Sequence, residues 1–399
     1  MNILNNMNIN INHLPISLTG ALTLLSLIVC SCSSPCQDSM IGKNGEPYKI
    51  EMTDMKDSLE LHYSDLFSSV RYIELSDNPT EAIISSITKL EITQDGDLVI
   101  FDRDKSKIVR YDSNGLFLNL IGEKGLAPNE YINLEAIAYD KFDNQVLAYD
   151  AGKRKILCYT LEGKMVKSIS VPYLSAFSVV DKDHLILYNN YIMKEPDFNY
   201  VIIDKEGKEE YKIEKINNIL EGGPYPSTGS VFNRLDNGEL LCWSFLSTTI
   251  FKLENGQEKH FAEIIPPSDD WSVAGPDKTR EANENSKKKK LIHSMVYINN
   301  HFLLTGYNIQ DGYTFFYWTD LQGHGRGGKT FVNDMTGLYP LDYILGTNGK
   351  NLYCGLLPFL HEPLLKQWKE RQDIPQSDKD LVSKLANSAN PIIQVCTVK

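Results

Sequence analysis

The 399-residue sequence predicts an all-β protein, a six-bladed β-propeller with four antiparallel strands in each blade. Two observations support this prediction. A strand–turn–strand pattern occurs six times, and the last unit lacks a fourth strand, whereas an unassigned strand precedes the first unit. The composition agrees, because 42% hydrophobic and 23% charged residues are ordinary for a globular chain.

The repeat consists of apolar segments joined by short polar turns. Turns such as Asp95-Gly96-Asp97 and Asn237-Gly238-Glu239 favour tight hairpins, because glycine readily adopts the positive φ that these turns need. The second strand of each unit follows its turn, and these strands recur at intervals of 39 to 62 residues. They are expected to begin at Leu98, Val146, Leu185, Leu240, Phe302 and Leu352.

Each unit continues with a third strand, which usually ends in a turn containing glycine, and then with a fourth strand. In the first unit the third strand ends in Asp112-Ser113-Asn114-Gly115. Four short strands in a unit of about 40 to 50 residues are typical of a propeller blade. The fourth strands are expected at residues 116–121, 165–171, 211–216, 261–265 and 330–332.

The sixth unit indicates how the ring closes. Its third strand is expected at residues 392–398, so its fourth strand must come from elsewhere in the chain. The unassigned segment 70–75 can supply that strand, and pairing removes an exposed edge that would invite aggregation. We therefore expect the N-terminal and C-terminal strands to pair in the last blade.

The last unit also contains a small helical insertion at about residues 356–390. Its first helical pattern covers residues 361–370, and Leu364 and Trp368 lie one turn apart on one face. A second pattern covers residues 377–389. Two roles stay open for the insertion: a lid over the channel mouth or a packed decoration without a ligand.

The N-terminal region is typical of a secretion signal followed by a lipidation site. Residues 1–31 contain no Asp, Glu, Lys or Arg, and the 16-residue apolar run within them is short for a membrane-spanning helix. Cys32 follows the small residue Ser31 and resembles the lipidated cysteine of bacterial lipoproteins. A plain secretory signal is the alternative. The expected organisation is a signal peptide over 1–31, a lipidated tether over 32–64 and the propeller over 65–399.

One stretch of the first unit also resembles a known family. Val109-Arg110-Tyr111-Asp112-Ser113-Asn114-Gly115 leads into Leu120-Ile121-Gly122, and Gly125-Leu126-Ala127-Pro128-Asn129-Glu130-Tyr131 follows. This run is similar to the motif of six-bladed β-propeller lipoproteins of gut Gram-negative bacteria, which are related to NHL-repeat and TolB-like propellers. Ala127 and Asn129 stand where the motif has glycines. The resemblance covers about residues 70–399, and it implies the fold and a location in the cell envelope but no established reaction.

Candidate ligand-binding residues are expected on one face of the propeller. The loops between the fourth strand of one blade and the first strand of the next surround the channel mouth there, and loops commonly carry function. Aromatic rings in such loops offer sugars or peptides a flat surface, although most tyrosines in a β-rich chain are simply strand residues. The candidates are Glu130, Tyr131, Arg154, Tyr225, Trp271 and Tyr339.

The sequence predicts no catalytic residue, no metal ligand and no cofactor. The glycine-rich run 323–328 satisfies GxGxxG but leads into the expected strand 330–332, whereas a dinucleotide site needs a helix, so we expect a turn. The cysteines form no CxxC pair, and a disulfide between Cys354 and Cys396 stays open.

The charge balance restricts the partners. Acidic residues outnumber basic ones by 52 to 40, and the resulting net charge of −12 repels nucleic-acid phosphates. The expected partners are the membrane, through the lipid anchor, and a glycan, a peptide or an outer-membrane protein. The expected location is the cell envelope, as an outer-membrane lipoprotein that faces the periplasm or the surface.

The sequence therefore favours a non-catalytic, membrane-anchored propeller that binds a glycan, a peptide or an outer-membrane transport component through its channel-mouth loops. The alternative is a metal-dependent hydrolase, lactonase or lyase that acts on a sugar or another small molecule. This alternative stays open because several blades could contribute channel-lining residues that form no local motif, with a divalent ion such as calcium in the channel.

Overall fold

All the residues described below belong to one compact unit, Ile41–Lys399. Within the described ranges, no helix is both long and apolar enough to cross a membrane. The computed structural model describes residues 46–53, 60–191, 197–215, 231–245, 247–254, 256–268, 271, 290–308, 311–336, 341, 343–357, 370, 372 and 376–399.

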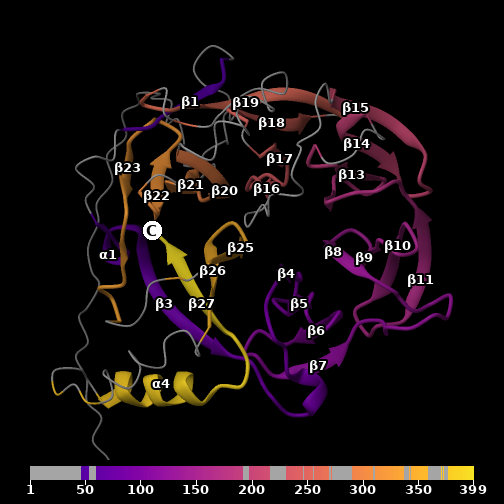
Figure 1. Ribbon diagram of the computed structural model, residues 1–399, viewed down its shortest axis with the longest axis horizontal. Coiled ribbons are helices and arrows are strands. Elements are labelled where there is room, and N and C mark those ends of the chain that lie inside the picture. Colours follow the sequence, from indigo (N-terminus) through magenta and orange to yellow (C-terminus); the bar gives the residue numbers. More distant parts are fainter. Residues whose placement is uncertain are drawn as a thin grey trace, which may run out of the picture. The chain divides into compact units, whose positions relative to one another are not determined.

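Six antiparallel sheets follow one another around a common centre in this unit, and each sheet is one blade (Figure 1). The predicted all-β, six-bladed propeller is therefore confirmed. Blade 1 contains β4 (Lys89–Ile92), β5 (Leu98–Asp102), β6 (Lys107–Tyr111) and β7 (Phe117–Leu120). Blade 2 contains β8 (Leu134–Asp140), β9 (Gln145–Asp150), β10 (Lys155–Thr160) and β11 (Met165–Ser170). Blade 3 contains β12 (Ala176–Val179), β13 (His184–Tyr188), β14 (Phe198–Asp204) and β15 (Glu209–Lys215).

The remaining three blades repeat this order, and the second strand of every blade begins within one residue of its predicted position. Blade 4 contains β16 (Phe232–Arg234), β17 (Leu240–Trp243), β18 (Thr249–Glu254) and β19 (Gln257–Ile265). Blade 5 contains β20 (Lys290–Ile298), β21 (His301–Asn308), β22 (Tyr313–Asp320) and β23 (Gly325–Gly328). Blade 6 contains β25 (Tyr343–Thr347), β26 (Asn351–Leu356), β27 (Ile392–Val398) and β3 (Phe67–Glu74).

The hydrophobic core lies between neighbouring blades. Strand β5 illustrates the principle, because successive side chains of a strand point to opposite faces of its sheet. Leu98 and Ile100 pack in the cluster shared with blade 6, whereas Val99 and Phe101 pack in the cluster shared with blade 2. A strand with neighbours on both faces has a mostly continuous apolar sequence, and the second strands of blades 1 to 4 show this pattern.

The ring closes as predicted, by pairing of the two terminal strands in blade 6. Strand β3 runs antiparallel to β27, with Ile73 opposite Ile393 and Tyr72 opposite Gln394. The fully buried Gln394 side chain accepts a hydrogen bond from Tyr63 Oη at 2.8 Å and donates one to Tyr72 Oη at 3.1 Å. Segments more than 300 residues apart in sequence are thereby joined in one sheet.

The prediction for the fourth strand of blade 5 was wrong. That strand is β23, the glycine-rich run Gly325–Gly328 that the sequence indicated as a turn, and it pairs with β22. The predicted segment instead forms β24 (Phe331–Val332) outside the blade. Glycine is needed in β23 because a Cβ at Gly325 would lie 2.3 Å from the hydroxyl oxygen of Tyr317. A strand without apolar side chains carries no signal in its hydrophobic pattern.

The segment before the propeller also contains strands, where the sequence indicated only a polar tether. Strand β1 (Tyr48–Glu51) pairs in parallel with β19 and becomes the fifth strand of blade 4. Strand β2 (Leu61–His62) pairs in parallel with β24, and the short helix α1 (Tyr63–Leu66) follows it. Through these two parallel strand pairs, the segment that contains β1 and β2 is hydrogen-bonded to blade 4 and to β24, which follows blade 5.

Within the described residues, η2 (Thr80–Ala82) and α4 (Gln376–Asn387) are two further helical segments between strands. The 3₁₀ helix η2 precedes blade 1, and α4 lies in the insertion between β26 and β27. The second predicted helix is thus confirmed. Its Val382 is fully buried against Leu356 and Ile392 of blade 6. The other predicted helix, over residues 361–370, falls almost entirely outside the described residues.

A partly buried carboxylate joins blades 3 and 4. Glu214 of β15 accepts hydrogen bonds from Asn199 Nδ2 at 2.7 Å, from Ser244 Oγ at 2.6 Å and from the hydroxyl of Tyr191. Its φ of 59° lies in the left-handed region, which is costly for a residue with a side chain. Burial raises the pKa of Glu214 although the three donors oppose the shift.

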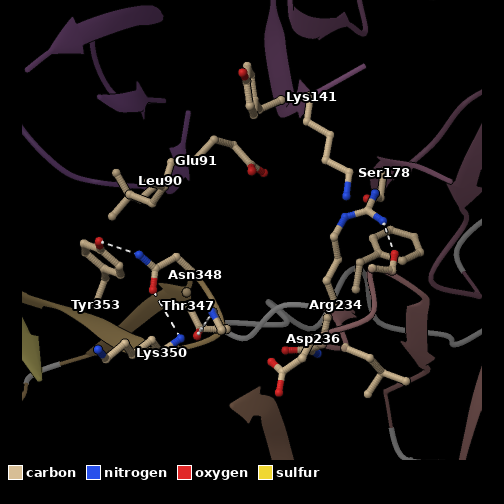
Figure 2. Close-up of a pocket in the computed structure, with 18 of the residues that line it drawn as sticks. Leu90, Glu91, Lys141, Ser178, Arg234, Asp236, Thr347, Asn348, Lys350 and Tyr353 are labelled. Atoms are coloured by element: carbon tan, nitrogen blue, oxygen red, sulfur yellow. Dashed lines mark hydrogen bonds between the residues drawn. The ribbon is translucent and has the colours of Figure 1, made fainter. Parts of the chain in front are cut away.

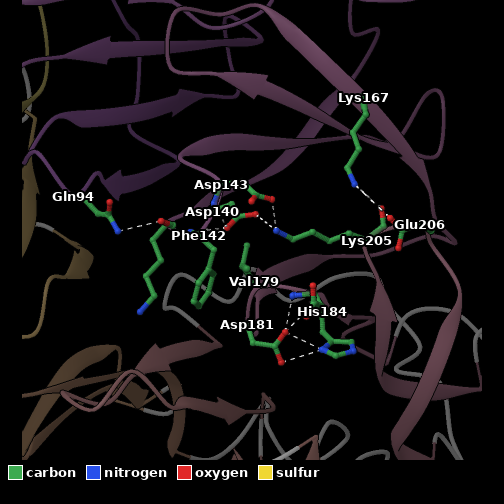
Figure 3. A network of polar contacts seen from close by, with 12 residues as sticks. Gln94, Asp140, Phe142, Asp143, Lys167, Val179, Asp181, His184, Lys205 and Glu206 are labelled. Atoms are coloured by element: carbon green, nitrogen blue, oxygen red, sulfur yellow. Dashed lines mark hydrogen bonds and ion pairs between the residues drawn. The ribbon is translucent and has the colours of Figure 1, made fainter.

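An ion-pair network joins blades 2 and 3 (Figure 3). The Nζ atom of Lys205 lies 2.5 Å from Asp140 and 2.6 Å from Asp143, and both Lys205 and Asp140 are buried. Burial lowers the pKa of Lys205, but the two carboxylates outweigh this effect and the pKa is raised. Nearby, His184 lies 2.9 Å from both Asp181 and Glu210. The charged groups of this junction therefore have partners of opposite sign.

Candidate ligand-binding cavity

A cavity of about 840 Å³ lies at the centre of the propeller (Figure 2). All six blades contribute to it, mainly through their first strands and the turns that follow those strands. The sequence had indicated the opposite face, where the fourth strand of one blade connects to the first strand of the next. Charged residues from blades 1, 2, 4 and 6 line the cavity: Lys89, Glu91, Lys141, Arg234, Asp236, Lys350 and Lys399.

Arg234 and Lys141 form the cationic wall of this cavity. Arg234 ends β16, and its guanidinium donates to the carbonyl of Gly238 at 2.9 Å and to the carbonyl of Val179. Lys141 follows β8, and Figure 2 shows its ammonium group beside the Arg234 guanidinium. Burial and the neighbouring Arg234 charge lower the pKa of Lys141, and burial also lowers the pKa of Arg234.

Glu91 of β4 supplies the carboxylate on the facing wall, and Figure 2 shows it directed into the cavity. It lies 3.6 Å from the ammonium group of Lys89, and both side chains are about one-third exposed or less. Burial raises the pKa of Glu91, while Lys89 and Arg234 oppose that shift. The alternation along β4 explains the arrangement, because Leu90, between these two residues, packs in the core between blades 6 and 1.

The turn after β25 forms a third part of the lining. Asn348 donates to Tyr353 Oη at 3.2 Å and accepts from the backbone N–H of Asn351 at 2.9 Å. These bonds hold the turn that places Lys350 at the cavity. The lining residues include five cationic and two acidic side chains, although the whole chain carries a net charge of −12. The cavity is therefore a locally cationic site in an acidic protein, which favours anions.

Two of the residues predicted to bind a ligand participate in the structure of one loop. The carboxylate of Glu130 accepts from the backbone N–H of Ala127 at 2.8 Å. Tyr131 is buried among the residues between blades 1 and 2, and burial raises its pKa to about 12. Neither Ala127 nor Asn129 has a positive φ, so the positions where the resembling motif has glycines do not need them here.

The other predicted residues are not gathered into one site by the described structure. Arg154 is exposed in the turn between β9 and β10, next to Lys153, which contacts the Glu130 loop. Trp271 is buried, with its ring edge-on to Phe315 at 5.0 Å. Cys32, Tyr225 and Tyr339 lie outside the described residues. None of the described candidates lines the central cavity, and their ligand-binding role stays a prediction.

Sequence reasoning missed Glu91, Lys141 and Arg234. Each lies in a first strand or directly after one, where a single charged residue looks like an ordinary solvent-facing position. A usable signal is that three units carry a charged residue at or near the end of the first strand. Nothing in the local sequence indicates that they converge, because they come from blades 1, 2 and 4.

The described part of the chain shows neither a candidate metal site nor a reactive thiol. No cluster of three or more His, Cys, Asp or Glu side chains there could hold a metal ion. Cys158, Cys242, Cys354 and Cys396 are buried free thiols. Burial raises the pKa of Cys158 to about 11, which keeps it in the unreactive thiol form at neutral pH.

Fold and cavity together define a six-bladed propeller with a central site of the size that small ligands occupy. The chain belongs to the family DUF4934, a domain of unknown function, whose model matches residues 47–397. No relative was found among curated proteins.

Two Bacteroides proteins are among the solved structures with a similar fold. A Bacteroides fragilis protein described as exported is 15% identical, with a TM-score of 0.69, and the match covers 88% of this chain and 99% of that one. A DUF4221 family member from Bacteroides vulgatus is 11% identical, with a TM-score of 0.50, and the match covers 84% of this chain and 97% of that one. At such identities the likeness shows the fold alone.

Proposed function

We propose that this protein is an exported, non-catalytic binding protein that holds its ligand in the central cavity. The observation that supports this most is the cavity of about 840 Å³, which falls within the size range of small-molecule sites. Its lining comes from all six blades, so the closed ring holds the binding groups rigidly and limits the entropy lost on binding. A glycan or a peptide is the proposed ligand class, and an outer-membrane transport component is the proposed protein partner.

Attachment to the outer membrane through a lipid on Cys32 is part of this proposal. The sequence pattern before Cys32 supports it, as does the fold shared with an exported Bacteroides fragilis protein. Cells fed labelled palmitate should incorporate the label into the protein, and Cys32→Ala should abolish incorporation. Cys36→Ala is the matched control and should keep the label. Label retained in Cys32→Ala, or absent from the wild type, would contradict the anchor.

The binding function can be tested by thermal unfolding of the full-length protein in detergent, with panels of glycans, peptides and divalent ions. A ligand that binds only the folded state raises the melting temperature by mass action. We expect one class of glycan or peptide to do so. Ser178→Trp should abolish the shift by filling the cavity, whereas Ser168→Trp, on the outer strand β11, should preserve it. A shift produced only by calcium and reversed by EDTA would favour the metal-dependent enzyme, and no shift would contradict the binding function.

A further inference from the structure

The two cations of the cavity wall lie side by side (Figure 2), and the nearby carboxylates of Glu91 and Asp140 act on Arg234 electrostatically without forming an ion pair with it. Among the described residues, neither Lys141 nor Arg234 forms an ion pair with an acidic side chain. The Lys141 ammonium instead lies over the ring of Phe142, 5.2 Å from its centroid, and close to Gly238, where an added Cβ would be 3.5 Å from Nζ. Two neighbouring cations in a half-buried site repel each other, and a bound anion would relieve that repulsion.

The position of Arg234 is fixed by neutral groups. In the described part of the chain its guanidinium donates two hydrogen bonds, both to backbone carbonyls, which leaves three of its five N–H groups for a ligand. The remaining N–H groups of a guanidinium suit a planar carboxylate, and the Lys141 ammonium can bind the same group as a point charge. Arg234 and Lys141 therefore form a cationic pair suited to one anionic group.

Glu91 restricts what the rest of the ligand can be. It faces the same cavity from the opposite wall (Figure 2) and acts electrostatically on Arg234. Lys89 lies 3.6 Å from Glu91 and offsets part of its charge, but a second negative charge placed directly beside Glu91 would still be repelled, whereas a hydroxyl group would find a hydrogen-bond acceptor there. Asp236 extends the acidic part of the lining. The wall formed by Arg234 and Lys141 thus attracts one carboxylate, whereas the wall around Glu91 offers acceptors to neutral polar groups.

We infer that the cavity binds a small monocarboxylate carrying hydroxyl groups, the chemistry of a sugar acid, with its carboxylate on Arg234 and Lys141 and its hydroxyl groups towards Glu91. This inference rests on the proposed function and narrows its ligand class. The size of the cavity admits a single sugar acid or a short oligosaccharide that contains one.

The test is calorimetric titration of the full-length protein in detergent with galacturonate, with galactose and with the dicarboxylate galactarate. We expect galacturonate to bind at least ten times more tightly than the other two. Lys141→Met should weaken galacturonate binding about tenfold or more, whereas Lys164→Met, on an exposed turn, should have no effect. Glu91→Gln should selectively strengthen galactarate binding, and this readout does not depend on the cationic pair being removed.

The outcomes separate this inference from the proposed function. Equal affinity for galactose and galacturonate, unchanged by Lys141→Met but abolished by Ser178→Trp, would overturn the inference and leave the cavity as a binding site. Galacturonate binding that survives both Lys141→Met and Ser178→Trp would also overturn it, because the ligand would lie elsewhere. Absence of binding by all three compounds at millimolar concentration would reject the sugar-acid class, and the wider thermal panel would then decide on the binding function.

Discussion

Two regions of the molecule differ in whether their charged side chains have partners of opposite charge or hydrogen-bonding partners. At the junctions of blades 2, 3 and 4, Lys205 contacts two carboxylates, and Glu214 accepts three hydrogen bonds. In the central cavity, Lys141 and Arg234 lie next to each other without an acidic partner among the described residues. A satisfied charge stabilises the fold, whereas an unsatisfied charge at a cavity is suited to a ligand.

Removing the lysine of the blade 2–3 junction should have the largest effect on stability. Lys205→Met leaves the carboxylate of Asp140 buried without its cation, which should cost about 3 to 5 kcal/mol. Unfolding by denaturant measures the loss, and Lys208→Met, exposed in the same turn, is the control. A loss below about 1 kcal/mol would show that this junction does not depend on the ion pair.

Removing the carboxylate of the blade 3–4 junction should have the next largest effect. Glu214→Ala deprives Tyr191, Asn199 and Ser244 of an acceptor. Buried donors without partners cost about 2 to 3 kcal/mol together, even if some find new partners. The same denaturant experiment applies, with exposed Glu206→Ala expected within about 0.5 kcal/mol of the wild type. Equal stability of the two variants would show that the hydrogen bonds to Glu214 do not stabilise the blade 3–4 junction.

The pH dependence of the free energy of unfolding tests the protonation state of Glu214. Because burial raises the pKa of this carboxyl above its ordinary value of 4.5, the folded state binds the proton more tightly than the unfolded state does. The contribution of Glu214 is therefore greatest at low pH and is lost as the pH rises from about 4.5 through the raised pKa. The stability difference between wild type and Glu214→Gln should shift in favour of the variant between pH 4.5 and neutrality. A shift in the opposite direction would mean that the three donors hold the carboxylate ionised.

The cavity cation should give the smallest effect on stability. Lys141→Met removes an ammonium group that has no described ion-pair partner and that Arg234 repels, so stability should change by about 0.5 kcal/mol or less. Denaturant unfolding measures this change alongside Lys205→Met. A loss as large as that of Lys205→Met would place Lys141 among the structural charges and would undo the contrast between the two regions.

The fold was largely predictable because its signals are local. Apolar runs separated by Asp95-Gly96 or Asn237-Gly238 turns define hairpins, and the unpaired segment before blade 1 matched the strand missing from blade 6. Prediction failed where the local signal is weak. The strand Gly325–Gly328 has no apolar side chains, and β1 joins blade 4 through backbone hydrogen bonds in a polar segment.

The candidate site was much less predictable, because it depends on contacts between distant parts of the chain. Glu130 and Tyr131 stand out in the sequence, yet the structure engages them in a loop and in the core. Glu91, Lys141 and Arg234 do not stand out in the sequence. They become a candidate site only because three blades bring them to the same cavity. From the sequence alone, a charged residue in a strand is expected to face solvent, and only the three-dimensional structure shows that these residues line a cavity.

The most direct test of this account is a pair of measurements on one preparation of Lys141→Met. The account predicts an unfolding free energy within about 0.5 kcal/mol of the wild type together with a loss of galacturonate affinity of about tenfold or more. Unchanged galacturonate affinity combined with reduced stability would contradict it, because Lys141 would then support the fold and not a ligand.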